Sequence, residues 1–449
     1  MKKILVLFFL LILLLSAAFR FYLYPRLPIL NGHAAKTLCS CVFVAGIPEE
    51  KAVAEDIGFF PVSMGSKIVD YDTKSVTANF WGFKPKTAYY RGGLGCAFFN
   101  EGKPNDGSME RKVEIPDTLK NWFDYVDTVA TLNDRQKKAL DAALTWAFTE
   151  KDPEQPTLIT RAVAIVYKGQ LVGEKYAPGF TKESRLLGWS MTKTVTAALY
   201  GLLEKNNRLS LDDPLNVPHW KGTDKEKLRI RHLLNMSSGM EWEENYNDRS
   251  SVTKMLYESA NLGLTASQTK LVDAPGQKWY YSSGTSNILS YALAGYFPDQ
   301  RAYQRFPYDS LFARLGMSSM IIETDAAGYF IGSSYSWATA RDWAKFGVLL
   351  LNEGAFAGDT LLNPSWVKFM TSPVADSENS YGGHLWLNAD GQMGDVPDDA
   401  FYANGFHGQR ITVIPSKDLV IVRLGETYTQ SNFDFNQWTR QVIDAIEQE

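Results

Sequence analysis

Ser190 and Lys193 are the residues whose types and spacing most directly predict chemistry in this chain. They lie in Gly188-Trp189-Ser190-Met191-Thr192-Lys193, and residues 194–203, which follow, carry no charge. Such a stretch predicts a helix buried almost all round, on which positions three apart share one face. A poorly solvated lysine loses proton affinity and can take a proton from a neighbouring hydroxyl. Because free N–H groups at a helix N-terminus stabilise negative charge, the motif predicts an acyl-transfer site with Ser190 as nucleophile and oxyanion donor and Lys193 as base.

The Ser-x-x-Lys spacing occurs four times in the chain, so the surroundings of each serine decide its meaning. Ser251 and Ser267 lie in polar stretches typical of solvated caps or loops, and Ser365 follows Asn-Pro at a predicted helix start. Only Ser190 begins a long buried helix. Burial of a lysine in such a helix costs free energy, so the lysine is expected to have a function there. We predict that Ser190 is the nucleophile; the alternative is that it only caps the helix.

A second element is Tyr281-Ser282-Ser283, which follows a turn at Pro275-Gly276. A nearby lysine would lower the pKa of a tyrosine phenol, so Tyr281 is predicted to pass a proton between the serine and the leaving group. The alternative is a tyrosine that only packs against a helix.

The third element is residues 403–409, Ala-Asn-Gly-Phe-His-Gly-Gln, directly before a predicted strand. Glycine lets a strand edge approach a substrate closely, so Asn404 and Gly405 are predicted to contact the substrate. The Phe406 backbone N–H is predicted as the second oxyanion donor. His407 is either a further substrate contact or a loop histidine that faces solvent.

The elements that must position these residues follow from hydrophobic periodicity and turn signals. The pattern predicts a helix at 133–149, a hairpin of strands 162–167 and 171–176, a mainly helical region over 190–370, strands 411–414 and 419–424, and a helix at 434–447. This order predicts an α+β fold. One antiparallel sheet takes strands from both ends of the domain and is flanked by the N- and C-terminal helices of the domain. A mainly helical lobe lies beside the sheet, and the site is expected in the cleft between the sheet and this lobe.

Taken in order, the three elements resemble those of the serine β-lactamase and penicillin-binding-protein superfamily, nearest to its class C, esterase and 6-aminohexanoate-oligomer hydrolase branches. Ser190–Lys193 matches the Ser-x-x-Lys motif, Tyr281–Ser283 takes the place of Tyr-x-Asn, and 403–405 takes the place of Lys-Thr-Gly or His-Thr-Gly. Supporting likenesses are residues 233–239 and 340–343. The resemblance covers about residues 130–449 and implies a sheet-plus-helical-lobe fold and an acyl-enzyme mechanism without metal or cofactor.

Three departures from the family pattern bear on the substrate. Ala403 removes the cation or imidazole that the third motif usually presents to a substrate carboxylate, and Ser283 replaces an asparagine that contacts the substrate amide, so Ser283 is the expected contact here. Gly405 and Pro415 lie 415 − 405 = 10 apart, as in the short loop of the esterase-like branch. We therefore expect an esterase or amidase that acts on a small or linear acyl substrate. The alternatives are a class C-like β-lactamase or penicillin-binding DD-peptidase, and a non-catalytic envelope binding protein.

The N-terminus predicts export. Lys2 and Lys3 precede an apolar run over 4–15, followed by Ser16-Ala17-Ala18, which is the order of an export signal with a small-x-small cleavage site. The alternative is an uncleaved membrane anchor, because apolar and aromatic residues continue to Tyr24, interrupted only by Arg20, which can snorkel to a membrane face. Either way the protein is expected in the periplasm or attached to the outer face of the inner membrane.

The sequence divides into three parts. Residues 1–25 are the signal peptide or anchor, residues 26–115 are a β-rich accessory segment with strands at 42–44, 67–71 and 87–90, and residues 116–449 are the hydrolase domain.

Export makes the three cysteines candidates for oxidation. Cys39 and Cys41 lie two residues apart in a segment that is expected to be extended. One of them could therefore pair with Cys96 and leave the other as a buried thiol; the alternative is three buried thiols.

Composition excludes several other classes of protein. The 449 residues include 46 basic and 50 acidic side chains, a net charge of −4 that gives no sign of a nucleic-acid binder. Aromatic residues make up 13% of the chain, too many for a disordered protein. The 5 histidines have no paired spacing, which argues against a zinc enzyme.

Overall fold

The computed structural model describes residues 2–99, 109, 114–124, 132–150, 152, 156–428 and 432–448. The chain forms two compact units. Unit 1 comprises Met1–Arg91, Cys96–Gly107 and Trp242–Ala260, and unit 2 comprises Gly92–Gly95, Ser108–Glu241 and Asn261–Glu449. The sequence did not predict that residues 242–260 would join the N-terminal unit, and the division at residue 115 stays a prediction.

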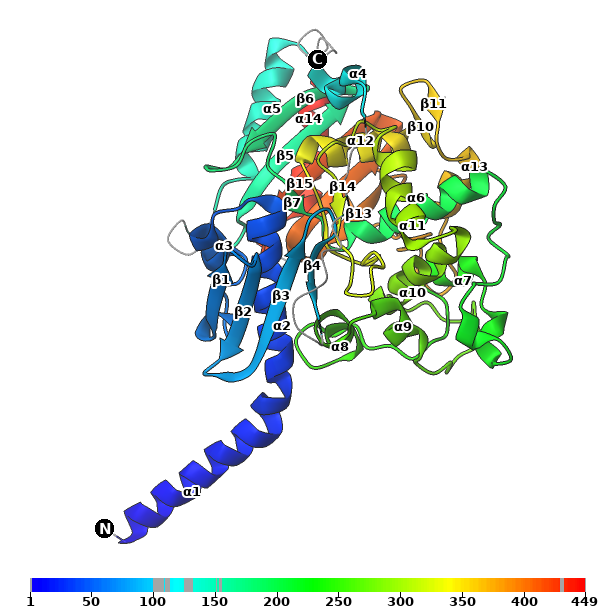
Figure 1. Ribbon diagram of the computed structural model, residues 1–449. Coiled ribbons are helices and arrows are strands. Elements are labelled where there is room, and N and C mark those ends of the chain that lie inside the picture. Colours follow the sequence, from blue (N-terminus) through cyan, green and yellow to red (C-terminus); the bar gives the residue numbers. More distant parts are fainter. Residues whose placement is uncertain are drawn as a thin grey trace. The chain divides into compact units, whose positions relative to one another are not determined.

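Unit 2 contains a six-stranded antiparallel sheet in the order β12-β13-β14-β15-β5-β6. Its strands are β5 (Thr160–Tyr167), β6 (Gln170–Tyr176), β12 (Trp386–Leu387), β13 (Phe401–Gly405), β14 (Gln409–Ile414) and β15 (Leu419–Gly425). Figure 1 shows β15, from the end of the chain, beside β5, and Ile421 pairs with Ile165. The prediction of one sheet with strands from both ends of the domain is confirmed, and so is the α+β class.

Helices cover both faces of this sheet. On one face, α5 (Asp134–Trp146) and α14 (Phe435–Glu447) bury Leu144 and Trp438 in a cluster with Ile165 of β5. On the other face, α12 (Ala340–Leu351) packs against β5, β14 and β15. Burial on both faces explains why β15 is apolar at nearly every position, since neither face meets water.

The remaining elements of unit 2 are mainly short helices, as the sequence predicts. The helices are α4 (Asp117–Lys120), α6 (Met191–Lys205), α7 (Ile230–Leu234), α9 (Leu262–Ser267), α10 (Ser283–Leu293), α11 (Gln300–Pro307) and α13 (Pro364–Met370). The strands are β7 (Leu186–Leu187), β8 (Ile321–Ile322), β9 (Ser336–Ala338), β10 (Ala355–Phe356) and β11 (Asp359–Thr360). Helix α6 packs against β13 and β14, which brings the first motif to the sheet.

Unit 1 is built around one long helical segment. Helix α1 (Lys2–Ala18) continues through helical turns into α2 (Leu27–Ser40), as Figure 1 shows in blue, and α3 (Glu49–Glu55) follows. Helix α2 packs against β2 and β3 of a four-stranded sheet in the order β1-β2-β3-β4 and against α8 (Ser251–Glu258). The strands are β1 (Ser66–Asp70), β2 (Ser75–Phe80), β3 (Phe83–Arg91) and β4 (Gly95–Phe98).

Two N-terminal predictions are corrected by this unit. Residues 42–44 are not a strand but part of a π-helical turn, Cys41–Ala45, that extends α2 until Gly46 ends it with φ +74°. Strand propensity failed here because the packing of α2 carries the helix onward. For the same reason Cys39 lies on a helix and not in an extended segment. The strand predicted at 67–71 corresponds to β1, and the one at 87–90 lies within β3.

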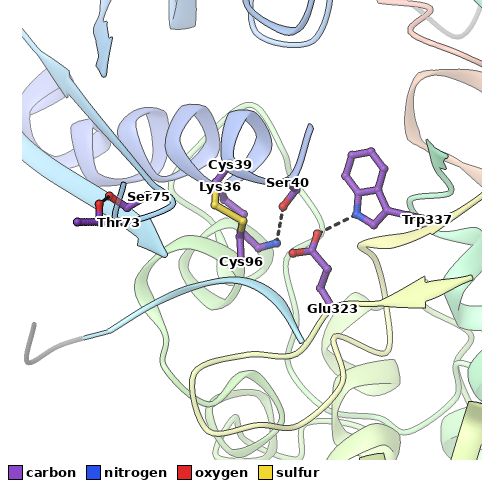
Figure 2. The surroundings of a disulfide bond; sticks show 8 residues. All are labelled: Lys36, Cys39, Ser40, Thr73, Ser75, Cys96, Glu323 and Trp337. Carbon is purple, nitrogen blue, oxygen red and sulfur yellow. Dashed lines mark hydrogen bonds between the residues drawn. A yellow bond between two sulfur atoms is a disulfide. The ribbon is translucent and has the colours of Figure 1, made fainter. Parts of the chain in front are cut away.

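A disulfide joins Cys39 of α2 to Cys96 of β4 within unit 1 (Figure 2). It lies next to Lys36 and Ser40, whose side chains are joined by a hydrogen bond of 3.1 Å. Cys41 is a buried thiol outside this disulfide.

We expect the disulfide to stabilise unit 1 substantially. It closes a loop with a sequence separation of 57 residues, for which the loop-closure entropy removed from the unfolded chain corresponds to about 4 kcal/mol. Denaturant unfolding of the Cys39→Ala/Cys96→Ala double variant should therefore show a lower free energy of unfolding than the oxidised parent. Reductant should lower the stability of the parent and leave the double variant unchanged; an equal response of both proteins would contradict the prediction.

Candidate functional site

Ser190 and Lys193 lie at the N-terminus of α6, and Lys193 Nζ donates a hydrogen bond of 2.9 Å to Ser190 Oγ. The Lys193 side chain is 1% exposed, whereas Ser190 is partly exposed. The serine side chain makes no capping hydrogen bond to the helix, so its hydroxyl is not used as a cap. A hydroxyl open to solvent on one side and bonded to a buried amine on the other is the arrangement that nucleophilic attack requires.

The residue before the serine has an unfavourable backbone conformation. Trp189 has φ +46°, which a non-glycine residue rarely adopts and which costs about 1–3 kcal/mol. Its indole packs against Tyr335, with ring centroids 5.1 Å apart, and edge-on against Phe406, at 5.7 Å. These ring contacts hold the turn that presents Ser190 and link it to the third motif.

Behind the lysine lies a buried polar network. Lys193 Nζ also donates to Ser283 Oγ at 3.0 Å and to the Ser333 carbonyl at 3.2 Å. Asn287 Nδ2 donates to the Ser283 carbonyl and to Ser333 Oγ, both at 2.8 Å. Ser283, expected to contact substrate, is 0% exposed, and its hydroxyl is directed to the lysine. The network therefore fixes where the amine lies.

His384 is buried close enough to Lys193 to feel its charge, and it is not a proton-transfer group near neutral pH. Its Nδ1 lies 2.7 Å from the Leu234 carbonyl and its Nε2 lies 2.9 Å from Ser286 Oγ, so Nδ1 carries the proton and Nε2 accepts. Burial lowers the pKa of His384 to about 3; the Leu234 carbonyl opposes this shift, and the charge of Lys193 adds to it. The imidazole is therefore neutral across the working pH range.

The lowered pKa of His384 gives a testable pH dependence of stability. The unfolded chain takes up a proton on this histidine below its ordinary pKa of about 6.5, and the folded protein does so only near pH 3. Stability from this group is therefore present above pH 6.5 and is lost as pH falls toward 3, by about 1.4 kcal/mol per pH unit. We expect His384→Gln, which keeps a donor and an acceptor, to show a correspondingly weaker acid dependence in denaturant unfolding. Parallel curves for the two proteins would contradict the assignment.

Tyr281 lies beside the amine, at the end of the loop that leads into α10. Lys193 Nζ lies 4.7 Å from the centre of its ring. The ring packs against Trp386, with centroids 5.4 Å apart, and edge-on against Tyr381, at 5.9 Å. Tyr281 is partly exposed, as is Ser190.

Residues of the third motif meet the first motif at the end of β13. A Cβ on Gly405 would lie 2.3 Å from the Gly188 carbonyl oxygen, so only glycine permits this approach of strand and serine turn. Phe406 follows directly and is partly exposed next to Trp189. Asn404 is partly exposed, and its Oδ1 accepts a hydrogen bond of 3.0 Å from Arg410 Nε.

His407 is buried, which overturns the expectation of a solvent-facing loop histidine. Its Nδ1 lies 2.7 Å from Glu426 Oε2, and its ring stacks on Phe406, with centroids 3.9 Å apart. The buried guanidinium of Arg423 donates to the Gly408 carbonyl at 2.9 Å. These bonds hold the 405–408 turn to β15, so His407 supports the position of Phe406 from behind.

The other three Ser-x-x-Lys serines lie elsewhere in the chain. Ser251 is the first residue of α8, and Ser365 is exposed at the start of α13. Ser267 is fully buried at the end of α9, where its hydroxyl lies 3.0 Å from His219 Nε2, so the expectation that it is solvated is wrong. None of the three begins a helix as buried as α6.

Sequence reasoning missed the partners that come from 333–335 and 381–386. His384, Ser333, Tyr381 and Trp386 belong to segments without a recognised motif, and only the fold brings them to Lys193 and Tyr281. The Gly382-Gly383-His384 run was the one available signal, since paired glycines before a lone histidine indicate a close approach of backbone. Among the described residues, no group of three His, Cys, Asp or Glu side chains could hold a metal ion.

Comparisons with known proteins show the family and the fold. The model of the beta-lactamase family matches residues 147–444. The 6-aminohexanoate-dimer hydrolase of Paenarthrobacter ureafaciens is 23% identical over 290 residues, which cover 59% of this chain and 72% of that protein. A solved Bacillus anthracis structure, assigned as a 6-aminohexanoate-dimer hydrolase, has a TM-score of 0.55 at 23% identity over 64% of this chain and 79% of that one. A Bacteroides dorei structure, assigned as a beta-lactamase, has a TM-score of 0.55 at 18% identity over 69% of this chain and 98% of that one.

Proposed function

Since the chain belongs to the beta-lactamase family of serine hydrolases, as its three motifs predicted, we propose that it is an exported esterase or amidase that works through an acyl-enzyme on Ser190. The observation that carries this proposal is the 2.9 Å hydrogen bond between Lys193 Nζ and Ser190 Oγ. A buried amine in contact with a partly exposed hydroxyl is the pair that acyl transfer needs.

The reaction follows from the positions of three side chains. In its deprotonated form, Lys193 takes the Ser190 proton as Oγ attacks the acyl carbon, and the carbonyl electron pair moves to the oxygen, which the N–H groups of Ser190 and Phe406 stabilise. The bond to the leaving group then breaks. Tyr281 gives its phenolic proton to that group and regains one from Lys193. Water then attacks the acyl carbon of the acyl-enzyme and gives a proton to Lys193 through Tyr281. The bond to Ser190 Oγ breaks, Oγ takes a proton back from Lys193, and the acid is released.

The substrate is proposed to be a small or linear ester or amide without an essential carboxylate at the third motif. Ala403 provides no cation there. The nearby guanidinium of Arg410 is bonded to Asn404 and lies 4.2 Å from the Tyr402 ring centre and 3.8 Å from that of Phe435. A substrate carboxylate would have to displace these contacts. The similarity to a 6-aminohexanoate-dimer hydrolase supports a linear amide as one substrate class.

Tyr281→Phe provides a test of the proton-transfer role. The phenyl ring keeps the contacts with Trp386 and Lys193, so the fold should be unaffected. We expect kcat for an anilide or linear amide to fall by about a hundredfold or more, since the departing amine must be protonated. A p-nitrophenyl ester, whose leaving group departs as an anion, should lose much less. Equal losses for both substrates would exclude the role.

Covalent labelling tests the proposal as a whole. Intact-protein mass spectrometry after incubation with a fluorophosphonate should show one adduct, which peptide mapping should place on Ser190. Fluorescent penicillin is the probe for the alternative, a class C-like β-lactamase or DD-peptidase; fast labelling by it, together with inertness toward esters, would favour that reading. The absence of any adduct would leave a non-catalytic envelope binding protein.

The proposed location rests on the N-terminal helix. In the part of the chain that the structure describes, the helical segment Lys3–Ala45 is long and apolar enough to cross a membrane by length and composition. Its apolar part, 4–15, is exposed along its whole length. We propose that this part is an export signal retained as an anchor, because its helix continues without a break into α2, which is buried in unit 1.

A further inference from the structure

Unit 1 carries a second apolar surface next to the N-terminal helix. The tip of the β2–β3 hairpin, Trp81–Lys84, is exposed, with 62% of Trp81 and 44% of Phe83 accessible to solvent. Large aromatic side chains are usually buried, so two of them together at a hairpin tip indicate a surface that meets an apolar partner.

The tip is fixed to the helix at Phe19 and Tyr24, shortly after the apolar run 4–15. The Phe83 ring lies 5.3 Å from that of Phe19 and 6.2 Å from that of Tyr24, and Lys84 Nζ lies 4.9 Å from the centre of the Tyr24 ring. The buried amide of Asn31 donates to the carbonyls of Phe83 and Lys84, at 3.0 and 2.6 Å. The tip therefore keeps its position relative to the helix.

That position corresponds to a membrane surface if the helix spans a bilayer. About 20 apolar residues at 1.5 Å each cross the hydrocarbon core, so a span that begins at Ile4 ends near Leu23. The tip meets the helix at residues 19 and 24, which is the same level. The residues gathered there, 19–24 and 81–84, are Phe-Arg-Phe-Tyr-Leu-Tyr and Trp-Gly-Phe-Lys, with two basic side chains and no acidic one.

We propose that the hairpin tip Trp81–Lys84 is a second membrane contact, which inserts its two aromatic rings at the headgroup level of the bilayer that α1 crosses. Amphipathic aromatic rings are enriched at this depth, and Lys84 and Arg20 are attracted to anionic headgroups. Two contact points fix the orientation of unit 1 on the membrane, which one helix alone does not. The proposal goes beyond the enzymatic function and rests only on α1 being retained as an anchor.

The other end of β2 supplies a matched control. Tyr71, in the β1–β2 turn, is an aromatic residue of the same unit and is 58% exposed. Its ring neighbour is Phe43, whose ring lies 5.8 Å away. Phe43 lies 24 residues after Phe19, which corresponds to about 36 Å along a helix. Tyr71 should therefore lie well outside the bilayer.

The experiment measures membrane depth at both positions. Trp81→Cys and Tyr71→Cys are each labelled with NBD in the full-length protein; the native cysteines do not compete, because two form the disulfide and Cys41 is buried. The proteins are reconstituted in vesicles that contain doxyl-labelled phosphatidylcholine with the spin label near the headgroups. We expect strong quenching at position 81 and quenching at position 71 no greater than for a water-soluble dye.

Two further measurements distinguish failure of the tip contact from failure of the membrane anchor and from loss of the enzyme activity. Leu10→Cys with a deep spin label reports whether α1 crosses the bilayer, and hydrolysis of a p-nitrophenyl ester reports the enzyme. Quenching at position 10 without quenching at 81 overturns the proposal and leaves a protein partner as the occupant of the tip. No quenching at position 10 overturns the anchor on which the proposal rests, while ester hydrolysis continues in either case.

The charge of the tip provides a quantitative check. In vesicles with added phosphatidylglycerol, Lys84→Gln in the Trp81→Cys protein should lower the ratio of docked to undocked tip by about fivefold, the effect of one basic residue near an anionic surface. The variant should not differ from its parent in vesicles of phosphatidylcholine alone. An equal loss in both lipids would mean that Lys84 acts through the fold, and this result would overturn the electrostatic part of the proposal.

Discussion

Ser190→Ala is expected to lower kcat/KM for a p-nitrophenyl ester by at least about a thousandfold, since loss of the nucleophile removes covalent catalysis and leaves only binding and the oxyanion donors. The variant should fold normally. The hydroxyl is partly exposed and makes no capping bond, so its removal leaves Lys193 with two of its three hydrogen-bond acceptors. The measurement is steady-state hydrolysis, with denaturant unfolding as the check on folding.

The chain offers its own control for this substitution. Ser365 heads another Ser-x-x-Lys sequence at an exposed helix start, so Ser365→Ala has the same chemistry outside the site. We expect full activity from this variant. A Ser190→Ala protein that retains the rate of the parent would remove the basis of the proposed function, whatever its fold.

Lys193→Met is expected to lower kcat by about a hundredfold to ten-thousandfold, the range that a positioned base contributes, with little change in KM. Methionine fills a similar volume without a basic group. The substitution removes the three hydrogen bonds that the lysine makes to Ser190, Ser283 and the Ser333 carbonyl, which lowers stability. It also removes the cost of burying the amine, which raises stability. These effects oppose each other, so the free energy of unfolding should change by about 1 kcal/mol or less.

Lys345 is the matched control, because it is a second buried lysine in unit 2, and its hydrogen-bond acceptors (the carbonyls of Lys120 and Gly316 and the Asp342 carboxylate) do not belong to the three motifs. Its Nζ lies 3.0 Å from Asp342 Oδ1, and both side chains are nearly inaccessible to solvent. Removal of one partner of a buried ion pair costs about 3–5 kcal/mol, so Lys345→Met should lose stability and keep its kcat. If Lys193→Met instead loses stability and keeps kcat, Lys193 is a structural lysine and not the base.

The sequence was sufficient where the signal is local. An uncharged run after Ser190 predicts a buried helix, and a spacing of three places lysine and serine on one face whatever surrounds them. Alternating and apolar strands around the turn at residues 168–169 likewise predicted β5 and β6, and periodic apolar residues predicted α5 and α14. Each of these inferences needs only the geometry of one helix or one hairpin.

Local signals failed where tertiary packing sets the structure. Residues 42–44 are β-branched and aromatic, yet they continue a helix because α2 is packed into unit 1. His407 was expected either to contact substrate or to face solvent from a loop; it is buried, with Nδ1 beside the Glu426 carboxylate and its carbonyl oxygen accepting from the Arg423 guanidinium.

The sequence by itself predicted the family and the fold class, which are confirmed, and it supplied the serine, lysine and tyrosine of the proposed site, because these depend on residue types at short spacing. Only the tertiary structure decided what surrounds them. It brought the hydrogen-bond acceptors of Ser283 and Ser333 to the Lys193 amine, and the rings of Trp386 and Tyr381 to the ring of Tyr281. It also brought the Trp81–Lys84 tip to the N-terminal helix. The reason is that such contacts join positions tens to hundreds of residues apart, and the free energy of packing the whole chain, not any local preference, selects which of them form.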